Sequence, residues 1–132
     1  MKLDYQFLKQ LLTAMENDSQ HTITNENLAR SAGVDFKSID EEKFDKFVGH
    51  VRQLQDNGCI DCISPDLGFK QNSNDHWTVT RVRYRLTNHG YEFLDILNEN
   101  KIFNKVKDFS ISTALELGKH LLTEVVTGAV IR

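Results

Sequence analysis

Proline is nearly absent from this sequence, with one residue in 132, and glycine is scarce, with seven. Disordered chains are rich in these residues and poor in aromatic side chains, whereas aromatic residues make up 9% of this chain. The composition therefore argues against a disordered protein and predicts a globular one. A chain of this length can bury a core of its own, and we expect a single domain over residues 1–132.

Long apolar runs and a cysteine framework are missing as well. No uninterrupted apolar stretch approaches the roughly 18 residues needed to cross a bilayer, and the first four residues contain no apolar signal-peptide core. The two cysteines, Cys59 and Cys62, are too few for a set of stabilising disulfides and are expected to be reduced thiols. These absences predict a cytoplasmic protein without membrane contacts.

Positive charge is not in surplus either. The chain has 16 Lys and Arg residues against 19 Asp and Glu residues, which gives a formal net charge of -3. A DNA-binding protein must neutralise phosphates with Lys and Arg side chains. Any DNA-binding surface on this protein must therefore concentrate its positive charge locally.

What the sequence does contain is a series of well-marked helices. Apolar residues recur at helical spacing after Asp4, a good N-cap residue, until a polar cluster interrupts them. A brief β-branched segment at 22–24 and a short helix at 25–32 are expected next. The third helix begins after Asp40 and ends at Gly58. Its apolar stripe consists of Phe44, Phe47, Val48, Val51 and Leu54.

A hairpin and further helices are predicted after the third helix. Residues 59–63 and 77–86 are expected to form the two strands, joined through a turn and a long polar tip. Thr87 caps the next helix, and a last amphipathic helix begins at about Ser112.

The order of these elements predicts an α+β fold, a winged helix-turn-helix with additional C-terminal helices. We expect the winged-helix core at residues 1–98 and a helical extension at residues 99–132. Two stretches, HVRQLQDNG at 50–58 and RLTNHGYEFLD at 85–95, resemble a bacterial and phage winged-helix family of unknown function. In that family a glycine-terminated helix leads to a wing and then to a Leu-Thr-x-x-Gly-x-x-Phe-Leu helix. The resemblance implies a regulator of phage or mobile-element type and no catalytic residue.

The wing is the most basic surface that the sequence predicts. Side chains alternate between the two faces of a strand, so three arginines of the second wing strand should share one face. Lys70 is expected near the wing tip. These cations can contact phosphates or an acidic protein, or they can cover the sheet with their aliphatic stems. The residues expected to face solvent are Arg81, Arg83 and Arg85, opposite Val82, Tyr84 and Leu86.

The third helix supplies a second group of candidate DNA-binding residues. In a winged helix this element enters the major groove, where Arg pairs with guanine and Gln with adenine. The candidates on its outward face are Lys46, Arg52 and Gln53. The same face carries the acidic residues Glu42, Asp45 and Asp56. Because acids repel phosphate, a solvated face of mixed charge is the alternative interpretation.

The last helix has a seam of apolar residues at alternating spacings of four and three. This seam fits either packing onto the domain or pairing with a second copy, and we expect a homodimer. The seam consists of Ile111, Leu115, Gly118, Leu122, Val125 and Ala129. The expected dimer contacts are Ile111, Leu115, Leu122 and Val125.

No cofactor, metal or catalytic residue is expected. Cys59 and Cys62 have the spacing of half a zinc site, but no second such pair exists, and in a strand the two would point to opposite faces. No histidine lies in a nucleophile or metal motif. The leading hypothesis is a small, non-enzymatic protein that binds double-stranded DNA. The alternative is a protein-interaction module on the same scaffold, a phage-encoded modulator of a host complex.

Overall fold

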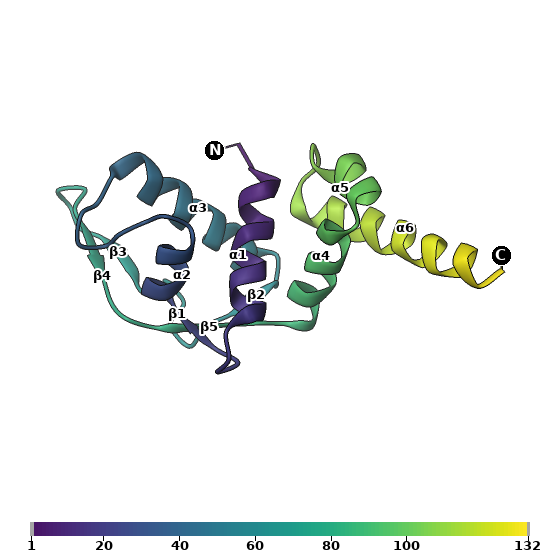
Figure 1. The fold of residues 1–132 in the computed structure, drawn as a ribbon. Helices are drawn as coiled ribbons and strands as arrows, with labels where there is room; N and C mark the ends of the chain where they lie inside the picture. The colour runs from purple at the N-terminus through teal and green to yellow at the C-terminus, as the bar shows by residue number, and fades with distance from the viewer. Residues whose placement is uncertain (1, 132) are drawn as a thin grey trace.

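The computed structural model describes the backbone of residues 2–131 and the side chains of residues 2–124 (Figure 1). Within these residues helices and short antiparallel strands alternate, which confirms the α+β class. The elements are α1 (Tyr5–Asn17), β1 (Ile23–Thr24), α2 (Asn25–Ser31), α3 (Glu41–Asp56), β2 (Ile60–Asp61), β3 (Phe69–Gln71), β4 (Trp77–Val79), β5 (Arg83–Leu86), α4 (Asn88–Asn98), α5 (Asn100–Val106) and α6 (Ile111–Ile131).

Strand β5 is the centre of a three-stranded antiparallel sheet with the order β1-β5-β2. Tyr84 of β5 pairs with Ile23 of β1, and Leu86 pairs with Ile60 of β2. Strands β3 and β4 form a separate hairpin, in which Lys70 lies opposite Thr78. We call this hairpin and its tip, residues 69–79, the wing.

The predicted continuous strand over residues 77–86 is wrong, because two strands separated by Thr80–Val82 stand in its place. The cause is Asn25, whose side chain is fully buried. Its Nδ2 donates to the Thr80 carbonyl (2.8 Å) and its backbone amide donates to the Val82 carbonyl (2.9 Å). The backbone bond extends the β1–β5 register by one residue, whereas the side-chain bond occupies the Thr80 carbonyl where the chain passes from pairing with β3 to pairing with β1. The expected strand at 59–63 is likewise shorter, with only Ile60–Asp61 in the ladder.

The predicted helix starts are confirmed by their caps. The side chains of Asp4, Asp40 and Thr87 each accept a hydrogen bond from an amide three residues later. Gly58, just after α3, has φ of 71°, the left-handed conformation that commonly ends helices.

One core joins all six helices and the sheet. Helix α1 contacts α2, α4 and β5, while α5 and α6 both contact α4. Figure 1 shows α1 near the middle, with α2 and α3 on one side and α4 on the other. Tyr84 is fully buried, and its hydroxyl donates to the Leu67 carbonyl (2.6 Å). Ile102 and Ala114 belong to the same buried cluster, so the beginning of α6 is part of this core.

The Leu-Thr-x-x-Gly segment connects the start of α4 to the turn between α3 and β2. Thr87 donates from its amide to the Cys59 carbonyl (3.0 Å) and from its hydroxyl to the Gly58 carbonyl (2.5 Å). The same hydroxyl accepts from the Gly90 amide (3.2 Å). A Cβ atom at Gly90 would collide with the Cys59 carbonyl. Close packing of two backbones therefore accounts for the glycine in this segment.

Gly90→Ala should strongly destabilise the protein. The added methyl group meets a main-chain oxygen, which cannot move without breaking the turn after α3. Overpacking of this kind costs about 1–3 kcal/mol, and we expect a loss of this size in urea unfolding. Asn88→Ala, at an exposed position of the same helix turn, is the control and should leave the midpoint nearly unchanged. Equal midpoints for the two variants would contradict the close approach at Gly90.

Candidate nucleic-acid interface

Three arginines form an exposed row, two of them in β5 and one just before the strand. Arg81, Arg83 and Arg85 are exposed, whereas Tyr84 and Leu86 are buried on the opposite face. The predicted alternation is therefore confirmed, with Val82 half-buried at the break in the strand. We call these three residues the arginine row.

Two members of the arginine row form ion pairs with neighbouring elements. Arg81 lies 3.4 Å from Glu26 of α2, and Arg85 lies 3.1 Å from Asp61 of β2. Arg83 instead donates to the carbonyl (3.2 Å) and hydroxyl (3.1 Å) of Thr22, so within the described residues it has no carboxylate partner. Exposed pairs of this kind contribute only about 0–1 kcal/mol each. A phosphate group can therefore compete for these guanidinium groups at little cost.

Lys70 lies on the wing, in β3, and is exposed. Its Nζ is 3.8 Å from Asp66, a long ion pair across the turn before the wing. The pKa of Asp66 is lowered chiefly by the Gly68 amide, which donates to its carboxylate (2.9 Å), and then by the Ser64 hydroxyl. The carboxylate therefore belongs to the turn, and Lys70 is held loosely beside it.

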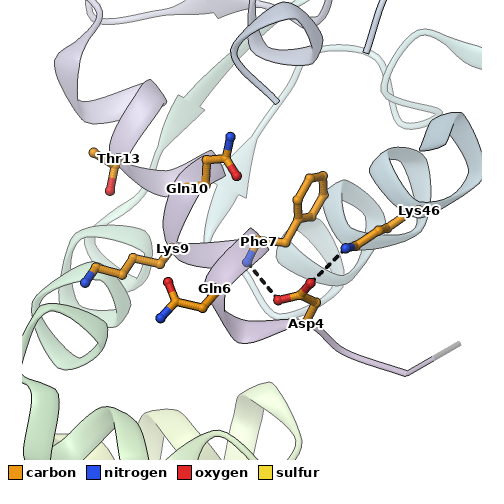
Figure 2. Close-up of a pocket in the computed structure, with 7 residues that line it drawn as sticks. All are labelled: Asp4, Gln6, Phe7, Lys9, Gln10, Thr13 and Lys46. Carbon is orange, nitrogen blue, oxygen red and sulfur yellow. Dashed lines mark hydrogen bonds and ion pairs between the residues drawn. The ribbon is translucent and has the colours of Figure 1, made fainter. Parts of the chain in front are cut away.

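Lys46 does not join the arginine row. Its Nζ lies 2.7 Å from the Asp4 carboxylate and 4.7 Å from the centre of the Phe7 ring. Figure 2 shows this pair at the start of α1, in a shallow hollow of about 440 Å³ that Gln6 and Gln10 also line. Lys46 is the main cause of the lowered pKa of Asp4. Lys46, a candidate DNA-binding residue, is therefore already paired with a neighbouring acid, as Arg81 and Arg85 are.

The other two candidates on α3 have different surroundings. The Arg52 guanidinium lies 5.4 Å from the centre of the Trp77 ring on the wing. Gln53 is half-buried, and its backbone carbonyl accepts from the Asn57 side chain (2.8 Å). The acids Glu42, Asp45 and Asp56 are exposed, as predicted. This face of α3 therefore presents three exposed acids beside an exposed Arg52 and a half-buried Gln53.

A buried histidine joins α1 to α3, and the sequence did not indicate its role. His50 is fully buried among apolar side chains of α3. Its Nε2 accepts from the Asp4 amide (2.9 Å), so its Nδ1 carries the proton and donates to the Lys46 carbonyl (2.8 Å). Burial is the main cause of its lowered pKa, and the positive charge of Lys46 lowers it further. Position 50 follows Phe47 by three residues, which was the available sign that it faces inward.

The buried histidine should make stability depend on pH. The folded pKa of His50 lies below the unfolded value of 6.5, so the unfolded chain binds a proton more readily. The free energy of unfolding should therefore fall as pH decreases below about 6.5, and level off below the folded pKa. His50→Gln, which can donate and accept without titrating, should lack this decrease in urea unfolding from pH 8 to pH 5. Parallel curves for both proteins would exclude His50 as the cause.

The two cysteines occupy unequal sites. Cys59 is fully buried, and burial raises its pKa to about 12. Cys62 is half-buried, and its pKa is also raised, chiefly by burial. Neither is an activated thiolate. Within the described part of the chain, no three His, Cys, Asp or Glu side chains gather as metal ligands.

Helix α6 first packs on its own chain and then extends away from it. Ile111 is only 1% exposed and lies in the core, so it is not available to a second copy in this structure. Gly118 lies against Ile96, where a Cβ atom would collide with the isoleucine side chain. Leu115 and Leu122 are half-buried, and the side chain of Val125 lies outside the described residues. Among the helices that can be assessed, none is both long and apolar enough to cross a membrane.

The structure thus defines a small α+β domain with an antiparallel sheet and an exposed arginine row. Residues 2–116 match the model of the family described as "Hypothetical protein (DUF2513)". This match covers most of the chain, and the protein belongs to that family, whose function is unknown. The expected relation to a family of unknown function is confirmed. No curated protein matches the chain. No solved structure matches it either.

Proposed function

We propose that this protein is a winged-helix domain that binds double-stranded DNA as a small regulator and catalyses no reaction. The order of elements supports this proposal, because three helices and a short strand precede a hairpin that leads into the central strand of the sheet. Helix-turn-helix proteins use this scaffold to dock on a duplex. The resemblance of residues 50–58 and 85–95 to a bacterial and phage winged-helix family supports a regulator of phage or mobile-element type.

The arginine row is the observation that carries the proposal. Residues two apart on a strand are separated by about 7 Å, so Arg83 and Arg85 project from one face of β5, and Arg81 lies exposed just before the strand. Arginine forms bidentate hydrogen bonds with phosphate, and its charge persists at all physiological pH values. Lys70 on the wing can add a fourth contact, since its ion pair with Asp66 is long.

The acidic face of α3 shapes the kind of DNA binding that we propose. Phosphate contacts position a protein on the duplex, whereas base contacts give sequence specificity. Glu42, Asp45 and Asp56 oppose deep entry of α3 into the major groove. We therefore infer that binding is dominated by phosphate contacts from the arginine row and depends steeply on salt.

Replacing the arginine row with alanine should weaken duplex binding and reduce its salt dependence. Each lost phosphate contact lowers the slope of log K against log salt by about 0.9, so the triple variant should lose roughly two to three units. The control is Lys101→Ala, Lys105→Ala and Lys107→Ala, which removes the same charge from exposed positions on and beside α5. The measurement is fluorescence anisotropy with a labelled duplex at several salt concentrations. Equal slopes for the two triple variants would remove the arginine row from the interface.

A protein-interaction module is the second candidate function. The exposed acids of α3 favour it, because they suit a basic protein surface better than a phosphate backbone. Neutralisation of Lys46 by Asp4 leaves this face more acidic. Duplex binding that is absent even at low salt, in both the native protein and its triple variants, would favour this candidate over DNA.

We also propose that α6 pairs with a second copy through the part of the seam beyond Gly118. Figure 1 shows the end of α6 extending away from α4 and α5, which makes this part of the helix accessible to another molecule. Leu122 is half-buried, which leaves apolar area available there. Pairing through Leu122 would form an isologous interface, in which both copies use the same residues.

Light scattering should therefore detect a dimer with twice the 15.2 kDa mass of the chain. Leu122→Glu should shift the protein toward the monomer, because pairing would bury an unpaired carboxylate. Thr123→Glu, which adds the same charge at the adjacent exposed position, should leave association unchanged. A monomer at all accessible concentrations of the native protein would refute the pairing.

A further inference from the structure

The only tryptophan of the chain fixes the wing against α3. Trp77 lies in β4 and is half-buried. Its ring meets the ring of Phe44 edge to face, with centroids 5.5 Å apart. The Arg52 guanidinium lies 5.4 Å from the centre of the same ring, eight residues further along α3. One side chain of the wing therefore contacts α3 at two places, one aromatic and one cationic.

The opposite strand of the wing also packs on α3. Phe69 of β3 contacts Phe44 (5.8 Å), Phe47 (6.0 Å) and Phe36 (6.1 Å) through edge-to-face ring pairs. Phe69 is 1% exposed and thus belongs to the core. The base of the wing is held by this aromatic cluster, whereas Trp77 lies nearer the polar tip and contacts both Phe44 and Arg52.

We propose that Arg52 is a positioning residue, which holds the wing on α3 through Trp77 and does not read a base. Arginine stacks on aromatic faces because its guanidinium is planar and weakly hydrated. A guanidinium over the indole ring is not directed into a groove, as recognition of a guanine edge would require. The inference rests on the proposed DNA-binding function only where it concerns the duplex.

The position of the wing matters to the arginine row because the two are directly connected. Strand β4 runs through Thr80–Val82 into β5, and Arg81 lies within this connection. Lys70 lies opposite Thr78 in the hairpin. A wing that leaves α3 would therefore shift Lys70 relative to the arginine row. Arg52 acts on DNA binding by keeping these cations in one arrangement.

The first test uses the protein without DNA. Arg52→Ala should increase acrylamide quenching of Trp77 fluorescence and speed hydrogen exchange in residues 69–79 by about two- to fivefold, as expected for loss of an exposed cation–π contact. Arg52→Lys should restore part of the native value. The control is Lys43→Ala, which deletes another exposed positive charge of α3. If Arg52→Ala and Lys43→Ala behave alike, Arg52 does not hold the wing.

The second test measures duplex affinity against salt. Arg52→Ala should weaken binding by the same two- to fivefold factor on unrelated sequences with an unchanged salt slope. A slope reduced by about 0.9 would make Arg52 a phosphate contact, and a loss confined to one sequence would make it a base reader; either result overturns the proposal. Trp77→Ala also removes the contact with Phe44 and should weaken binding at least as much, and adding Arg52→Ala to it should change nothing further. If the native protein binds no duplex, the proposed function fails while the first test still decides the role of Arg52.

Discussion

The buried amide of Asn25 determines how the sheet and the wing are related. Its Nδ2 donates to the Thr80 carbonyl, and its Oδ1 accepts from the Glu26 amide (2.9 Å) and the Val82 amide (3.4 Å). A buried amide must satisfy its donors and acceptors, so this residue holds the start of α2 against the connection between β4 and β5. Gly68 passes close by with φ of 84°, where a Cβ atom would collide with Asn25 and Thr80. Only a glycine fits this crossing without strain.

The close approach of Asn25, Gly68 and Thr80 separates Lys70 on the wing from the arginines of β5. Because the chain leaves the ladder at Thr80–Val82, β3 and β4 turn toward α3 and pack on its aromatic residues. Strand β5 remains in the sheet, with its arginines facing solvent. A continuous hairpin would instead carry the wing outward as an extension of the sheet. The Asn25 side chain therefore marks the point at which the docked wing and the sheet strand with its arginines separate.

The helices could be predicted from the sequence because their signals are local. Asp4, Asp40 and Thr87 cap their helices by bonds that span three residues, and apolar spacing shows which side faces the core. The break in the 77–86 strand could not be predicted in this way. Alternation continues through the break, since Arg81 is exposed and Val82 is half-buried, while its cause lies more than 50 residues away in Asn25.

The candidate site was predictable to a similar extent. Period-two alternation predicted the exposure of the arginine row correctly, because successive side chains of a strand point to opposite faces of the sheet. The partners of Lys46 and Arg52 were not predictable, since Asp4 and Trp77 reach them from distant elements. The role of His50 was not predictable for the same reason. Its ring accepts a hydrogen bond from the backbone amide of Asp4, the N-cap residue of α1, which is distant in the sequence.

Ion pairs beside the arginine row determine how easily each member can bind phosphate. Among the residues that the structure describes, Arg83 has only the oxygens of Thr22 as partners, so its charge is the least compensated of the three. Glu26 also pairs with Arg30 at 2.5 Å and stays compensated when Arg81 leaves it. Asp61 has an exposed side chain and returns to water when Arg85 is withdrawn. Loss of an ion pair is costly when it leaves a buried charge without a partner. Transfer of Arg81 or Arg85 to a phosphate would leave neither Glu26 nor Asp61 in that state. In the proposed complex, the acids around the row would therefore weaken binding to phosphate without preventing it. They would also reduce long-range attraction to DNA, as expected for a protein whose net charge is -3.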